Sequence, residues 1–180
     1  MRRSMRVTVL ICALFGATPV LAQRPVSIGI AGGASIPSGN LRDGVETGWH
    51  GLATIAVSTL MQPLGLRIDI AYNRFAFSDD ATALADEYQS TASATLNFTY
   101  RLPMTNSPMS PYLISGLGAY RSECSLETGC EPGTRYGWNV GLGTKVFVLG
   151  LRSFLEARYH RTEIGDTDVQ YFTPTLGILF

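Results

Sequence analysis

Residues 169–180 read Val-Gln-Tyr-Phe-Thr-Pro-Thr-Leu-Gly-Ile-Leu-Phe, an extended segment that carries the chain to its last residue. Alternate positions fall on one face of such a strand, and here that face is apolar: Phe172, Pro174, Leu176, Ile178 and Phe180. A soluble protein rarely leaves an apolar strand edge open to other chains. A closed membrane barrel has no open edge and turns its apolar face toward lipid. This segment therefore predicts a transmembrane β-barrel, with a bulge or missing ladder bond at Pro174.

Seven further segments with alternating polarity precede this one, separated by turn-rich stretches. Together they predict eight strands, the even number that single-chain bacterial barrels use, and most reach the length that a tilted strand needs to cross the hydrocarbon. We expect an all-β fold, an eight-stranded antiparallel up-and-down transmembrane barrel. The predicted strands are Val26–Ser35, His50–Met61, Leu66–Phe77, Gln89–Leu102, Tyr112–Arg121, Arg135–Phe147, Arg152–Arg161 and Val169–Phe180.

The N-terminus has the pattern of an export signal. Arg2, Arg3 and Arg6 precede the apolar run 7–15, and small residues precede a cut expected before Gln23. Residues 1–22 are thus predicted to be a cleaved signal peptide, and residues 23–180 one barrel domain. Three of the 14 basic residues leave with the signal, so the mature chain carries 11 basic against 14 acidic residues, with Lys145 as its one lysine. No basic cluster remains, and nucleic-acid binding is not expected.

The connections predict how the barrel is oriented. Four long ones (36–49, 78–88, 122–134 and 162–168) alternate with tight turns near 62–65 and 148–151 and a proline-rich connector at 103–111. Twelve of the 14 acidic residues lie in the long connections. Long external loops and short periplasmic turns are typical of these barrels, so we expect four external loops and periplasmic termini. Aromatic residues gather near the predicted strand ends, as in interfacial girdles.

The second face of each strand is polar and points into the lumen. An eight-stranded barrel is only wide enough for side chains to fill, and charges shielded from water need partners. The sequence therefore predicts a salt-bridged plug rather than a large channel. The charged residues on the lumen parity are Arg67, Asp69, Arg101, Lys145, Glu156 and Arg158.

Three segments resemble strands of the small outer-membrane β-barrel domain family (OmpA/OmpX-like): residues 111–120, 137–143 and 154–160, together with the closing 173–180. The resemblance covers the whole mature chain, but its motifs are structural and name no activity. It implies location in the outer membrane of a Gram-negative-type bacterium and insertion by the barrel-assembly machinery. A monomer surrounded by outer-membrane lipid and lipopolysaccharide is expected.

Two further sets of residues suggest local roles. Cys124 and Cys130 share the third long loop, and export to an oxidising compartment predicts a disulfide between them rather than a metal site. Four arginines at the outer strand ends could bind lipopolysaccharide phosphates, although pairing with loop acids or snorkelling explains them equally well. These arginines are Arg74, Arg121, Arg135 and Arg161.

No catalytic, cofactor or metal site is predicted. His160 and Thr162 faintly resemble the His-x-Ser motif of outer-membrane lipid A deacylases, but threonine replaces serine and the parity of His160 turns it into the lumen. The expected role is structural, or contact of the loops with an external protein partner. A narrow pore is the main alternative. A soluble periplasmic ligand-binding barrel, with its apolar parity inward, and a lipid A-modifying enzyme are the others.

Overall fold

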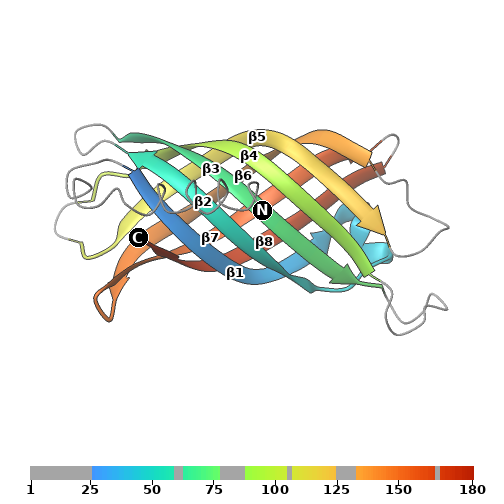
Figure 1. Cartoon of the computed structure of the whole chain (residues 1–180), viewed down its shortest axis with the longest axis horizontal. Helices are drawn as coiled ribbons and strands as arrows, with labels where there is room; N and C mark the ends of the chain where they lie inside the picture. The colour runs from blue at the N-terminus through green and yellow to red at the C-terminus, as the bar shows by residue number, and fades with distance from the viewer. Residues whose placement is uncertain (1–25, 59–62, 78–87, 105–106, 125–132, 165–166) are drawn as a thin grey trace, which may run out of the picture.

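The computed structural model describes residues 26–58, 63–77, 88–104, 107–124, 133–164 and 167–180. They form eight strands and one short 3-10 helix, arranged as a closed barrel (Figure 1). In order, the elements are β1 Val26–Ser38, η2 Gly39–Asp43, β2 Gly48–Ser58, β3 Leu64–Ala76, β4 Tyr88–Arg101, β5 Ser110–Cys124, β6 Gly133–Val148, β7 Leu151–Ile164 and β8 Thr167–Leu179.

Each strand pairs antiparallel with the next, and β1 pairs antiparallel with β8 to close the ring. The β1–β8 ladder pairs Gly29–Gly33 with Thr175–Leu179, and it resumes in the same register at Ile36 and Phe172. Pro174 lies in the gap between the two parts, where its missing amide hydrogen leaves a ladder bond unmade. The predicted eight-stranded antiparallel barrel is confirmed.

The apolar parity faces outward, as predicted. In β8, Phe172, Leu176 and Phe180 are exposed, whereas Tyr171, Thr173 and Thr175 are buried inside the ring. The same alternation runs along β4, where Leu96 and Phe98 face out. Ser153 has the outward parity of β7 but is buried, because its small side chain lies in register between the larger Val146 and Ile178. The outward apolar belt is the reverse of what a soluble ligand-binding barrel requires.

The start of β1, the end of β8 and the β6–β7 hairpin lie at one end of the barrel, which we call the turn end. We call the opposite end the loop end. In Figure 1 the C-terminus and the β6–β7 hairpin lie together at the left, and η2 lies at the right. The β6–β7 connection is Leu149-Gly150, and both residues have positive φ angles, 51° and 79°. This is the backbone that two-residue hairpin turns of type I′ need.

The strands run further at the loop end than the sequence pattern indicated. β7 continues to Ile164 and β8 begins at Thr167, so the predicted fourth long loop is mostly ladder. An antiparallel ladder needs only backbone groups, so polar side chains did not end it. The first connection contains η2, which sequence alternation did not predict. Among the described residues, no helix has the length and apolar character to cross a membrane.

Candidate functional site

Two opposite walls of the barrel supply a buried charge quartet: Arg67 and Asp69 from β3, Glu156 and Arg158 from β7. The members of each pair are two residues apart, so both side chains point into the lumen. In a ring of eight strands β3 and β7 lie across from each other. The quartet therefore spans the lumen.

Each arginine of the quartet contacts both acids. Arg67 donates from Nη1 and Nη2 to the two oxygens of Glu156, at 2.8 Å each. Its Nε lies 2.9 Å from the Asp69 carboxylate. Arg158 donates from Nη2 to Asp69 Oδ2 at 2.7 Å and from Nε to Glu156 Oε1. All four side chains are buried, and two positive charges balance two negative ones.

Neighbouring strands add neutral donors to the two carboxylates. Tyr112 Oη on β5 donates to Glu156 Oε2 at 2.6 Å, and Asn97 Nδ2 on β4 donates to Asp69 Oδ2 at 3.0 Å. Asn139 on β6 donates to Asn97 at 2.8 Å. Buried carboxylates with several donors are the well-compensated form of an internal ion pair. The quartet is therefore a brace between walls, and the cavity between it and the histidines on its loop side measures only about 10 Å³.

Above the quartet, toward the loop end, lies a layer of buried histidines and threonines. His160 Nδ1 is 3.1 Å from Tyr120 Oη, and its Nε2 is 3.2 Å from Thr173 Oγ1. Its ring also stacks on Tyr171, with ring centres 4.8 Å apart. His50 Nε2 lies 3.0 Å from Thr175 Oγ1. This layer keeps His160 inside the lumen, at the parity predicted for it.

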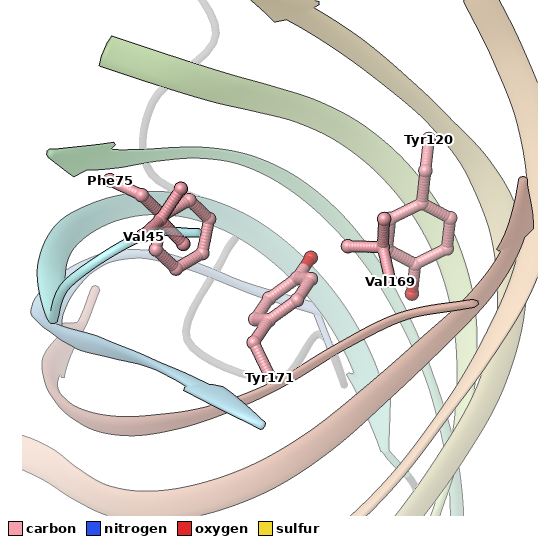
Figure 2. Packing of buried hydrophobic residues seen from close by; sticks show 5 residues of the cluster. All are labelled: Val45, Phe75, Tyr120, Val169 and Tyr171. Carbon is pink, nitrogen blue, oxygen red and sulfur yellow. The ribbon is translucent and has the colours of Figure 1, made fainter. Parts of the chain in front are cut away.

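Figure 2 shows the apolar cluster at the loop end, which we call the cap: Val45, Phe75, Tyr120, Val169 and Tyr171. The rings of Phe75 and Tyr171 meet edge to face at 5.6 Å. Val45 comes from the segment after η2 and pairs with Phe77 through an isolated bridge, which brings it over the barrel mouth. Buried side chains of the quartet, the histidine layer and the cap therefore follow one another along the lumen toward the loop end.

Arg101 and Lys145, grouped with the quartet by parity, do not join it. They lie at the turn end, where they line a cavity of about 210 Å³ with Arg152. Strand parity predicts that a side chain points inward but not its height along the barrel axis. On β7, Glu156 and Arg158 lie four and six positions farther from the turn end than Arg152 does.

Of the four arginines predicted at the outer strand ends, the structure places three on the outward face and one on the lumen face. Arg74, Arg121 and Arg161 occupy the outward parity of β3, β5 and β7 at the loop end, next to exposed aromatic residues. Trp49–Tyr72 and Trp138–Tyr159 are ring pairs of this region, at 5.9 and 5.7 Å. Arg121 pairs with Glu123 at 2.8 Å, and the Arg74 guanidinium lies 3.9 Å from the Tyr88 ring. Arg135 has the lumen parity of β6, so it does not face the lipid as its three counterparts do.

Some predicted features lie outside the described residues: the signal segment, Cys130 and most of the loop acids. The proposed disulfide and signal cleavage therefore stay predictions. No group of three or more histidine, cysteine or acidic side chains suited to a metal occurs in the described part of the chain. His160 and Thr162 are both buried in the lumen, away from the lipid face.

Sequence reasoning missed two functional elements. One is the capping role of Val45, which lies in a loop and carries no strand periodicity. The other is Arg152, whose inward parity with Phe154 and Glu156 could have marked it as a lumen charge.

A family model described as the outer membrane protein beta-barrel domain matches residues 8–180. Comparison with curated proteins found no match. Among solved structures, Neisserial surface protein A is similar with a TM-score of 0.65 at 18% identity, over 86% of this chain and 96% of that chain.

Two further structures are similar at lower scores. The Yersinia pestis outer membrane protein Ail, in a phospholipid bilayer nanodisc, has a TM-score of 0.53 at 20% identity, over 88% of this chain and 100% of that one. A major outer membrane protein from Thermus thermophilus has a TM-score of 0.55 at 12% identity, over 86% and 98%. At these identities the likeness concerns the fold alone.

Proposed function

Because this chain belongs to the outer membrane protein β-barrel domain family, we propose that it acts in the outer membrane as a plugged barrel with a structural or surface-interaction role. The observation that carries the proposal is the filled lumen. The quartet braces opposite walls, and the histidine layer and the apolar cap occupy the space above it. A barrel built in this way stabilises itself instead of conducting solutes.

In this proposal the loop end faces outward and the turn end faces the periplasm. Short periplasmic turns and longer external connections are the family's usual asymmetry. Arg74, Arg121 and Arg161 then lie just beyond the outer aromatic girdle, at the depth of lipopolysaccharide phosphates. Guanidinium groups bind phosphate oxygens with two parallel hydrogen bonds. The loops would be free to contact a protein partner, and the barrel would be a monomer without a cofactor.

The experiment is planar-bilayer recording of the barrel purified from outer membranes, with its gel mobility measured before and after boiling. We expect faster migration of the unheated band and no discrete conductance steps. Unchanged mobility would contradict a detergent-resistant closed barrel. A reproducible conductance in the wild-type chain would contradict the plug.

A narrow pore is the second candidate, because the turn-end cavity already reaches the level of Arg67. Only the quartet and the layers above it then separate the two ends. The same recordings decide between the two candidates, with Glu156→Ala as the informative variant. A pore predicts conductance in the wild type that the variant enlarges. A plug predicts conductance in the variant alone, or in neither.

Lipopolysaccharide contact has its own test. The triple variant Arg74→Ala, Arg121→Ala and Arg161→Ala should lower thermal stability in bilayers that contain lipopolysaccharide and leave it nearly unchanged in phospholipid alone. An equal loss in both bilayers would assign these arginines to the barrel itself.

A further inference from the structure

The turn end of the lumen is hollow, in contrast to the filled loop end. Its cavity of about 210 Å³ is lined by lumen residues of several strands. At about 30 Å³ per water molecule, it holds on the order of seven waters. The quartet closes it on the inner side through Arg67, so it is a cup that opens only at the turn end.

Three basic side chains line this cup, in addition to Arg67: Arg101 on β4, Lys145 on β6 and Arg152 on β7. Each has the lumen parity of its strand, together with Asn97, Asn139 and Glu156 respectively. They therefore point into the cup, and lipid phosphates on the outer surface are not their natural partners. A set of arginines that served the membrane interface would occupy the outward parity.

The cup offers Lys145 and Arg152 no acid from the described residues. No carboxylate among the described residues lines it, and Glu156, just beyond, already accepts hydrogen bonds from Arg67, Arg158 and Tyr112. Within the described part of the chain, Lys145 and Arg152 form no ion pair. The nearest aromatic contact of Lys145 is the Tyr112 ring, 6.0 Å from Nζ. Lys145 is half-buried, whereas Arg152 is exposed at the open end of the cup. Like charges that line one cavity repel one another, and an anion between them removes that repulsion.

The inner wall of the cup is apolar. Phe154 and Leu179 are both buried there and pack in one cluster with Leu52. Phe154 also lies beneath the Arg67 guanidinium, 5.5 Å from ring centre to Cζ. The cup thus combines an apolar surface with cations, which is the usual pairing of a site for a small organic anion.

We propose that the turn-end cup binds a small amphiphilic anion, with a phosphate or carboxylate head between Lys145, Arg152 and Arg101 and a short apolar body against Phe154 and Leu179. The head provides the negative charge that the lining lacks, and the body covers the apolar wall. The ligand enters from the turn end, since the quartet and the cap close the other route. The site belongs to the barrel alone and does not depend on the proposed surface role.

Binding is measured by titration calorimetry on the barrel purified from outer membranes in a neutral detergent. The probes are hexyl phosphate, hexanoate, inorganic phosphate and hexanol. We expect saturable binding of the two amphiphilic anions and at least tenfold weaker binding of hexanol and of inorganic phosphate. Hexyl phosphate tighter than hexanoate would point to a phosphate ligand such as a lipid head group, and the reverse order to a free carboxylate. Hexanol binding as well as the anions would overturn the proposal.

The variant Lys145→Gln with Arg152→Gln should weaken hexyl phosphate binding at least tenfold. Arg121→Gln is the matched control, because it removes a cation at the far end of the barrel, and it should bind as the wild type does. Equal loss in both variants, or none in either, would show partition into the micelle and overturn the site.

Lys145 also permits a test without any variant, because it is the chain's one lysine. A soluble amine-acylating reagent should modify it, and mass spectrometry of the peptide 136–152 reports the extent. Hexyl phosphate should slow this modification and hexanol should not. Equal rates with and without hexyl phosphate would place the anion elsewhere.

Discussion

The buried quartet makes a quantitative prediction about Glu156. Glu156→Gln keeps the size of the side chain and removes its charge. The wild-type carboxylate accepts four hydrogen bonds, two from Arg67 and one each from Arg158 and Tyr112. After the change, two guanidinium groups share the single carboxylate of Asp69, so the braced centre carries an uncompensated positive charge.

Breaking a buried ion pair on one side costs about 3–5 kcal/mol, and we expect a loss of this size in the free energy of unfolding. The matched control is Glu123→Gln, which neutralises the acid of the Arg121–Glu123 pair. Those side chains are 65% and 56% exposed, and an exposed pair contributes about 0–1 kcal/mol. The same chemical change should therefore differ several-fold in effect between the two sites.

Adding Arg158→Met to Glu156→Gln restores the charge balance, with Arg67 left facing Asp69. The double variant should be more stable than the sum of the single losses by about 1–3 kcal/mol. The assay is reversible urea unfolding in phospholipid vesicles, followed by the fluorescence of Trp49 and Trp138. Equal losses at Glu156 and Glu123, or strict additivity in the double variant, would refute the reasoning that the quartet is a compensated brace.

Three smaller changes follow from local geometry, each read in the same unfolding assay. Gly116→Ala should lower the free energy of unfolding by about 1–3 kcal/mol, because the new Cβ would lie 2.5 Å from the Leu96 carbonyl oxygen. Gly51→Ala is the control: its Cβ would meet open space, and the change should be neutral. Equal effects of the two variants would contradict the steric argument. Leu149→Asn should stabilise by up to about 1 kcal/mol, since Leu149 is 97% exposed with φ of 51°; a destabilised variant would argue against the turn. Tyr171→Phe removes a buried hydroxyl that has no hydrogen-bond partner among the described residues, so it should be neutral or stabilising. Tyr120→Phe loses the hydrogen bond to His160 and should cost about 1 kcal/mol. A larger loss for Tyr171→Phe than for Tyr120→Phe would contradict these hydrogen-bond assignments.

The sequence determined the strand number, the closed barrel and the two faces of each strand. These follow from a period of two, because any one-residue error in register would turn the apolar set of β4 or β8 into the lumen. The inward direction of Arg67, Asp69, Glu156 and Arg158 followed from the same rule. Sequence also placed the tight turn at Leu149-Gly150, where a short break separates two strand patterns.

The tertiary structure decided the height of each lumen side chain along the barrel axis and the packing of the cap at the loop end. Parity treats Lys145 and Glu156 alike, yet the stagger of tilted strands places one in an open cup and the other in a brace with partners from across the barrel. Val45 belongs to the cap but lies between η2 and β2, in a segment without the alternating polarity of a strand, so the sequence pattern did not predict its position. Contacts between residues as distant as Arg67 and Glu156 depend on how the sheet closes, and only the folded ring brings them together.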